Sequence, residues 1–215
     1  MFDRVAKRYD LANHLLSFGR DFFWRRRSAE IVAEWNPACV LDLATGSGDL
    51  ALALQHKISH AQIVGLDSSS AMLALARGKG VRHLIAADVA QLPLAEQSFD
   101  AITVAFGLRN VRDWAAALRE MRRVLTSGGH LLVLDFSLPS KPILHFLYRL
   151  YLRRILPLAS AIITREKEAY QYLGASIENF PSGRTMCDLI KTSGFQNVTA
   201  ESLTGGIVTI YTAEV

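Results

Sequence analysis

A short apolar segment that ends in a two-glycine turn constrains this chain most. Residues 40–43 are apolar apart from Asp42, and the turn Gly46-Ser47-Gly48 follows before an apolar helical pattern begins. Glycine adopts backbone angles that other residues avoid, and it lets a ligand approach the main chain closely. A strand, such a turn and a helix in this order predict a binding site for a nucleoside-containing cofactor.

Two further acids end the next two predicted strands. Asp67 follows the apolar run 63–66, where a carboxylate can accept hydrogen bonds from both ribose hydroxyls. Asp88 follows the third predicted strand and suits an adenine amino group, with Val89 against the ring. Asp42 would meet a cationic group such as the ammonium of a methionine moiety, but would repel a pyrophosphate. Acids at three successive strand ends therefore favour S-adenosylmethionine as the cofactor.

These signals leave alternatives open. The spacing Gly46-x-Gly48-x-x-Ala51, followed by Asp67, also fits the dinucleotide fingerprint of nicotinamide-dependent oxidoreductases. Asp88 could be a helix N-cap, and Asp42 a buried polar group satisfied by protein neighbours.

Length and composition predict one domain in a reducing compartment. The chain has 215 residues, half of them apolar, which is enough for the core of a single domain over 1–215. Cys39 and Cys187 have neither disulfide nor metal-ligand spacing, and the histidines are scattered, so we expect no metal site. The sequence shows no signal-peptide core or membrane-spanning run, and its net charge of +4 is mild. We therefore expect a cytoplasmic protein that binds no nucleic acid.

Strand and helix patterns alternate through the first two thirds of the chain. The predicted strands lie near 38–43, 61–66, 82–86, 99–106 and 129–135, and the predicted helices near 49–56, 69–78 and 113–125. This alternation predicts an α/β fold with a Rossmann-like, mostly parallel sheet and helices on both faces. Gly128-Gly129 is expected to stop the helix from 113.

Four parts are expected within this domain. Residues 1–36 form a helical cover over the cofactor cleft, with a break near 17–19, and residues 37–137 form the cofactor-binding core. Residues 138–195 form a helical substrate region, and 196–215 a C-terminal hairpin that adds an antiparallel strand.

Longer segments of the chain carry a family resemblance. Besides the glycine turn they are Tyr9-Asp10-Leu11-Ala12-Asn13, Phe106-Gly107-Leu108-Arg109-Asn110-Val111, Arg123-Val124-Leu125 with Gly128-Gly129, Leu134-Asp135-Phe136-Ser137, and Leu203-Thr204-Gly205-Gly206-Ile207-Val208. These segments resemble the ubiquinone/menaquinone C-methyltransferases, a family of class I S-adenosylmethionine-dependent methyltransferases, over nearly the whole chain. The resemblance implies methylation of a ring carbon on a polyprenylated quinol. The acceptor expected most is demethylmenaquinol, and the alternatives are the benzoquinol precursor of ubiquinone and a phytylated naphthoquinol.

The resemblance also implies individual cofactor contacts. They fall on Ser47, Asp67, Asp88 with Val89, and Ala105. The family often has serine where Ala105 stands, so only a backbone contact is expected at that position.

Three residues are candidates for the chemistry. Arg109 and Asn110 directly follow the fourth predicted strand, where the methyl group of the cofactor would point. We expect Arg109 to stabilise the charge that develops on a ring oxygen, and Asn110 to orient the ring hydroxyl or a water that acts as base. Asp135, at the end of the fifth strand, is a candidate proton acceptor. The structural alternatives are an ion pair of Arg109 with Asp135 or Asp113, and a helix cap at Asn110.

The segment 141–157 is apolar and aromatic, with a basic stripe at His145, Arg149 and Arg153. On a helix these three side chains share one face. The segment could contact a membrane surface, line a channel for an isoprenoid tail, serve a homodimer, or pack in the core with its basic stripe in solvent. A second basic group, Arg25-Arg26-Arg27, could be another lipid-facing patch or a solvent-facing helix surface, and we expect the latter. A lipid- or cofactor-binding protein without turnover remains an alternative to the enzyme.

Overall fold

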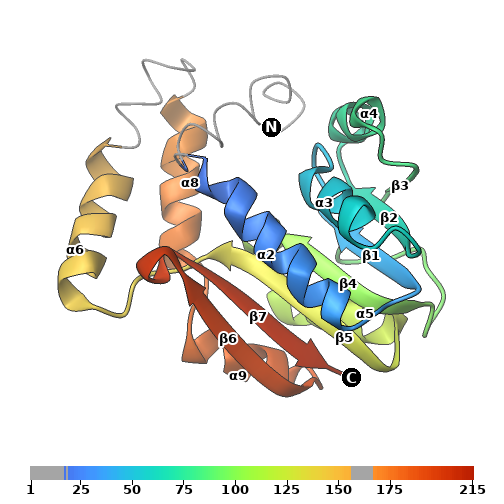
Figure 1. Cartoon of the computed structure of the whole chain (residues 1–215). Coiled ribbons are helices and arrows are strands. Elements are labelled where there is room, and N and C mark those ends of the chain that lie inside the picture. Colours follow the sequence, from blue (N-terminus) through green and yellow to red (C-terminus); the bar gives the residue numbers. More distant parts are fainter. Residues whose placement is uncertain (1–16, 18, 156–166) are drawn as a thin grey trace.

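The computed structural model describes residues 17, 19–155 and 167–215, and in this part of the chain seven strands form one sheet (Figure 1). The strand order is β3-β2-β1-β4-β5-β7-β6. The strands are β1 (Cys39–Leu43), β2 (Gln62–Asp67), β3 (His83–Ala86), β4 (Phe99–Ala105), β5 (Leu125–Phe136), β6 (Gln196–Leu203) and β7 (Val208–Glu214). β1 to β5 pair in parallel, whereas β7 runs antiparallel to both β5 and β6. The predicted mostly parallel sheet with an antiparallel strand near the C-terminus is confirmed.

Helices cover both faces of this sheet. They are α2 (Arg20–Glu34), α3 (Asp49–Lys57), α4 (Ser70–Lys79), α5 (Trp114–Val124), α6 (Pro142–Leu150), α8 (Lys167–Asn179) and α9 (Arg184–Thr192), with short turns η1 (Leu108–Asn110), η2 (Tyr151–Ile155) and η3 (Thr204–Gly206). Apolar residues of α2 and α3 pack on one face, and those of α5 and α9 on the other. Residues 1–16 of the expected helical cover lie outside the described residues, and α2 is the part of that cover which the structure describes.

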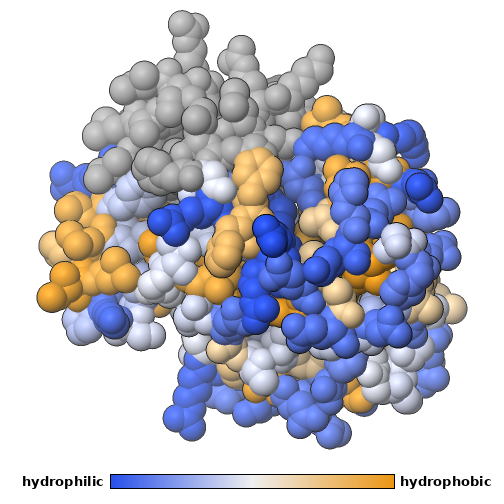
Figure 2. All heavy atoms as spheres, in the orientation of Figure 1, coloured by the Kyte–Doolittle hydropathy of each residue, from blue (hydrophilic) through white to orange (hydrophobic). Residues whose placement is uncertain are grey.

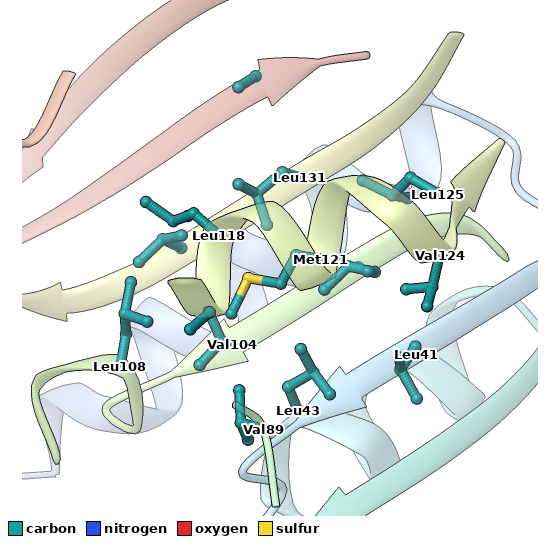
Figure 3. Packing of buried hydrophobic residues seen from close by; sticks show 14 of the residues in the cluster. Leu41, Leu43, Val89, Val104, Leu108, Leu118, Met121, Val124, Leu125 and Leu131 are labelled. Carbon is teal, nitrogen blue, oxygen red and sulfur yellow. The ribbon is translucent and has the colours of Figure 1, made fainter. Parts of the chain in front are cut away.

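The face under α5 shows how the sequence pattern becomes packing. Leu118, Met121 and Val124 lie on one side of α5 and are fully buried against Leu41 of β1 and Leu131 of β5 (Figure 3). The helix begins after Asp113, whose carboxylate accepts a hydrogen bond from Ala116 N at 2.9 Å. An N-cap of this kind satisfies an N–H group that the helix itself cannot pair.

The expected glycine stop after α5 is wrong. The helix ends at Val124, and β5 begins at the next residue and runs through Gly128 and Gly129. Gly128 has φ +75°, and its N–H donates to Val215 O at 3.2 Å, while Val215 N donates to Gly129 O at 3.0 Å. The two glycines therefore bend a strand and pair it with the C-terminal residue.

A third apolar cluster lies beyond the carboxyl ends of the central strands. Tyr148, Leu152 and Ile177, from α6, η2 and α8, are buried together, and Phe136 at the end of β5 packs against them. Gly174 of α8 allows this approach, because a Cβ there would lie 3.2 Å from Leu152 O. Across the described ranges, every helix is too short or too polar to span a membrane.

Candidate active site

A cavity of about 1000 Å³ opens where the carboxyl ends of β1, β2 and β4 meet α2, α6 and α8. Its lining divides by chemistry. One side is polar and acidic, and includes Asp21, Asp42, Thr45, Gly46, Ser47, Asp49, Asp67, Ser68 and Asp88. The other side is apolar, and includes Phe136, Leu144, Leu147, Tyr148, Tyr151, Leu152, Leu173, Ile177 and Ile207. Arg109 and Asn110 line the same cavity at the end of β4.

The glycine turn has the predicted geometry. Gly46 and Gly48 have φ +58° and +86°, which is the left-handed region that favours glycine. A Cβ on Gly48 would lie 2.6 Å from the Cγ2 atom of Val81, so the turn packs too closely for a side chain. At Gly46, in contrast, a Cβ would meet no atom closer than 4.0 Å. The turn thus leaves open space at the cavity wall for a ligand.

Asp42 lies 1% exposed at the cavity wall, at the base of the acidic side. Its two carboxylate oxygens accept hydrogen bonds from Thr45 Oγ1 at 2.6 Å and Thr103 Oγ1 at 2.7 Å. Burial raises the pKa of Asp42 to about 6, against the opposing effect of the two hydroxyls. The residue is therefore satisfied by protein neighbours, as the structural alternative expects, and it also faces the cavity. Thr103 was not singled out from the sequence because its role depends on the pairing of β4 with β1, whereas Thr45 lies only three residues after Asp42 and was overlooked.

The other two strand-end acids also line the cavity. Asp67 accepts hydrogen bonds from Gly46 N and Ser69 N, both at 2.9 Å, and so ties the glycine turn to β2. Asp88 accepts one from Ala90 N at 2.9 Å. It caps no helix, because the next described element is β4, so the N-cap alternative is wrong. Val89 lies beside it, 8% exposed, at the cavity wall.

Paired charges join α2 to the glycine turn. Lys79 Nζ donates to Ser47 Oγ at 3.0 Å and to Asp49 Oδ1 at 2.7 Å. Arg25 pairs with Asp21 one helical turn away, and its Nη2 lies 3.9 Å from Asp49 Oδ2. The Arg25–Asp21 pair is local, whereas the contacts of Arg25 and Lys79 with Asp49 connect three different helices and depend on the tertiary fold.

The expected solvent-facing surface over Arg25-Arg26-Arg27 is wrong for two of its three residues. Arg25 lines the cavity, and Arg27 forms two 2.9 Å hydrogen bonds with the carboxylate of Glu201 on β6. Arg26 is exposed and pairs with Glu30 on the same helix. Successive residues on a helix point about 100° apart, so three consecutive arginines cannot share one environment.

Two of the three candidate catalytic residues, Arg109 and Asn110, line the cavity, whereas Asp135 lies behind its wall. Arg109 lines the cavity, and its Nη1 donates to Asp135 Oδ1 at 2.8 Å. Asp135 is fully buried, accepts a further hydrogen bond from Phe136 N, and is not part of the lining. Burial raises the pKa of Asp135, and the adjacent Arg109 opposes that rise. The ion pair with Asp135 that was an alternative for Arg109 is present, and it coexists with exposure to the cavity.

Asn110 also lines the cavity, in turn η1. It does not cap the next helix, because Asp113 occupies the cap position of α5. Ala105 lies in the lining too, at the last position of β4.

Three aromatic rings of the cavity wall pack on one another. Phe106 and Phe136 have ring centroids 4.8 Å apart, and Trp24 of α2 packs on both, at 5.9 and 6.2 Å. The guanidinium of Arg25 lies 5.5 Å from the Phe106 ring and that of Arg109 5.3 Å from the Phe136 ring. Sequence reasoning missed this aromatic cluster, although Phe106 ends the predicted strand 99–106 and Phe136 directly follows the predicted strand 129–135.

The segment 141–157 packs in the core on one side, through buried Tyr148 and Leu152, and is exposed on the other. Ile143 and Phe146 on α6 are 78% and 67% exposed, and Figure 2 shows hydrophobic residues gathered over this part of the surface. The basic stripe is paired with protein, since Arg149 and Arg153 both contact Glu178 of α8. Residues 156–157 lie outside the described part of the chain.

The donor set of the cavity fits a cationic nucleoside. It combines a buried carboxylate, two further carboxylates at adjacent strand ends, and a glycine turn with open space beside it. In the ranges that the structure describes, no three His, Cys, Asp or Glu side chains are placed to hold a metal ion.

Comparison with known proteins gives a consistent result. Residues 1–214 match the ubiE/COQ5 methyltransferase family. A demethylmenaquinone methyltransferase from Thermus thermophilus is 44% identical, over 100% of this chain and 99% of its own length. The ubiquinone/menaquinone biosynthesis C-methyltransferase UbiE of Syntrophotalea carbinolica is also 44% identical, over 98% and 91%. A crystal structure of a SAM-dependent methyltransferase from Thermotoga maritima superposes with a TM-score of 0.71 at 21% identity, covering 99% of this chain and 97% of that one, which shows a shared fold.

Proposed function

Because this chain belongs to the ubiE/COQ5 methyltransferase family, we propose that it methylates a ring carbon of demethylmenaquinol with S-adenosylmethionine, to form menaquinol. The relatives named as demethylmenaquinone methyltransferases support this acceptor, and those named for ubiquinone as well make the benzoquinol precursor a second candidate. The family disfavours a nicotinamide-dependent oxidoreductase.

One observation carries the proposal: a single cavity joins an acidic side to an apolar side, and Arg109 and Asn110 line it. An acidic wall suits a cationic nucleoside, whereas an apolar wall suits a prenylated ring. We infer that residues 37–137 bind the cofactor and that 138–195 bind the acceptor.

The residues proposed to hold the cofactor lie on the acidic side. Asp42 would face the ammonium group, Asp67 the ribose, and Asp88 with Val89 the adenine. The backbone at Gly46, Ser47, Gly48 and Ala105 would complete the contact. When bound, S-adenosylmethionine supplies an electrophilic methyl group on a sulfonium sulfur.

On the acceptor side, the protein must stabilise charge and release a proton. A phenol with a pKa of about 10 is mostly neutral at pH 7, so negative charge on the ring oxygen needs a partner as it develops. We assign this role to Arg109. The ring carbon gains a carbon–carbon bond and loses its hydrogen as a proton, and Asn110 is proposed to orient the ring hydroxyl or a water that accepts the proton.

Asp135 takes a different role from the proton acceptor predicted from sequence. Its carboxylate lies behind Arg109 and makes no part of the cavity wall, so a proton from the acceptor has no direct path to it. We propose that Asp135 positions the Arg109 guanidinium.

We further propose that α6 contacts the inner face of the cytoplasmic membrane. Leu147 belongs to the cavity wall and is also 52% exposed, next to exposed Ile143, Phe146 and Leu150. The apolar wall is thus continuous with an apolar surface, here named the α6 strip. This continuity would let the ring enter the cavity while the isoprenoid tail stays in lipid.

Methyl transfer from labelled S-adenosylmethionine tests the proposed reaction. Demethylmenaquinol and the benzoquinol precursor are supplied separately in detergent under reducing conditions. Label in demethylmenaquinol is expected, and label in both acceptors would mean a shared enzyme. Binding of S-adenosylmethionine without transfer to either quinol would contradict the proposal and leave a binding protein without turnover.

A further inference from the structure

Tyr148 of α6 is a buried residue at the wall of the apolar side. Its side chain is held among Leu152, Ile177 and Phe136, and it is 7% exposed. Its ring stacks on Tyr151, with centroids 6.2 Å apart. These apolar contacts fix the ring, and part of its surface lines the cavity.

The hydroxyl of Tyr148 has no hydrogen-bond partner among the residues that the structure describes. It is not one of the fully enclosed polar atoms that lack a partner, so it keeps some accessible surface, and the residue borders the cavity. The hydroxyls of buried tyrosines normally find a partner within the protein. Tyr211, the other deeply buried tyrosine near β5, follows the rule: its hydroxyl accepts a 2.7 Å hydrogen bond from Gly183 N. An unpartnered polar tip at a cavity wall indicates a partner that enters the cavity.

The surroundings of Tyr148 point to the kind of partner. Tyr148 and Arg109 line the same cavity. Phe136 connects the two, since it packs against the Tyr148 cluster and carries the Arg109 guanidinium over its ring. Burial raises the pKa of Tyr148 well above its ordinary value, so the phenol stays protonated and can donate a hydrogen bond.

We propose that the Tyr148 hydroxyl donates a hydrogen bond to a ring oxygen of the acceptor and so selects hydroxylated aromatic rings. This inference rests on the proposed function for the identity of the acceptor. It adds a substrate-binding group on α6 to those at the end of β4. A ring oxygen that becomes more negative during methyl transfer would strengthen the bond.

Tyr148→Phe tests the proposal, with Tyr211→Phe as a matched control. Tyr148→Phe should lower kcat/KM for demethylmenaquinol by about 10- to 100-fold, as expected for loss of a hydrogen bond to a charged oxygen. Its Kd for S-adenosylmethionine and its melting temperature should not change, because no hydrogen bond within the protein is lost. Tyr211→Phe should lower the melting temperature and leave kcat/KM within about twofold of wild type. A kcat/KM for Tyr148→Phe within about twofold of wild type would overturn the proposal.

A binding measurement separates this inference from the proposed reaction. Wild-type protein should bind 1-naphthol more tightly than naphthalene, and Tyr148→Phe should reduce that difference by about fivefold or more. If wild type methylates no quinol but the difference shrinks in the variant, the reaction is wrong and the Tyr148 contact stands. An equal difference in both proteins, or no binding of 1-naphthol, overturns the contact whatever the enzyme methylates.

Discussion

Arg109 and Asp135 form an ion pair, with Nη1 and Oδ1 2.8 Å apart, that joins the cavity wall to the core. The carboxylate is fully buried, whereas the guanidinium faces the cavity and lies over Phe136. A charge held in this way has one orientation, because moving it would leave a buried carboxylate unpaired.

Breaking this pair from the buried side should affect stability and activity together. Asp135→Leu is expected to lower the free energy of unfolding by about 3–5 kcal/mol, since it leaves the Arg109 charge uncompensated. The double variant Asp135→Leu/Arg109→Met should recover most of that loss without recovering methyl transfer. Urea denaturation and the labelled-methyl assay measure the two effects. An Asp135→Leu variant as stable as wild type would contradict the contribution of the ion pair to stability. Methyl transfer by the double variant would contradict the role of Arg109 in the reaction.

Cofactor affinity should fall in acid because of Asp42. Its pKa is raised to about 6, so the carboxylate takes up a proton as the pH falls through 6 and loses its attraction for an ammonium group. Below that pH, Kd for S-adenosylmethionine should rise by up to about tenfold per pH unit. Calorimetry between pH 5 and pH 8 measures the change. Asp42→Asn should bind more weakly with little pH dependence, and equal wild-type affinity at pH 5 and pH 8 would argue against the assignment.

The glycine turn should not tolerate a methyl group at Gly48. Gly48→Ala combines φ +86° with a Cβ 2.6 Å from Val81, so we expect a loss of about 2–4 kcal/mol and much weaker cofactor binding. Gly78→Ala is the matched control on α4, where a Cβ meets nothing within 4 Å. That change should stabilise the protein by about 0.5–1 kcal/mol, as for an ordinary helical glycine. Chemical denaturation measures the free energy of unfolding of both variants. Equal changes in Gly48→Ala and Gly78→Ala would refute the packing argument.

Trp24 should anchor α2 over the cavity. Its side chain is 2% exposed, and its Nε1 donates to Thr204 Oγ1 at 2.8 Å. Trp24→Ala is expected to cost about 3–5 kcal/mol of stability through the lost packing and hydrogen bond. The neighbouring Phe23 is 56% exposed, and Phe23→Ala should change stability by less than about 0.5 kcal/mol. Thermal and urea unfolding measure the stability of the two variants. Similar losses of stability in Trp24→Ala and Phe23→Ala would mean that α2 is not held through Trp24.

The α6 strip should be needed for binding to lipid. Ile143→Ser/Phe146→Ser is expected to lower binding to anionic vesicles more than about tenfold without loss of stability, because both side chains are already exposed. Phe23→Ser removes similar exposed apolar surface from α2 and should retain binding. Vesicle sedimentation gives the comparison. Undiminished binding by the double variant would remove the membrane role, and a dimer that only wild type forms would assign the strip to a second copy of the chain.

Local patterns predicted the parts of this protein that depend on neighbouring residues. Gly46 and Gly48 set the turn because their positive φ angles favour glycine, and acids after apolar runs mark strand ends that parallel pairing brings to one edge. Periodicity predicted α5, but not that β5 would begin at Leu125, because pairing with β4 and β7 outweighed the glycine signal.

Tertiary structure decided which side chains meet. Trp24 and Thr204 are 180 positions apart, so no local pattern could have paired them. For Arg109 the sequence offered two partners, Asp135 and Asp113, and only the fold chose Asp135. The sequence by itself determined the sheet, the glycine turn and the acids at its edge, since backbone preference and burial period act over a few residues. Only the packing of distant elements placed Asp135 behind Arg109, left α6 exposed and turned Tyr148 toward the cavity, because those outcomes depend on which surfaces the folded chain covers.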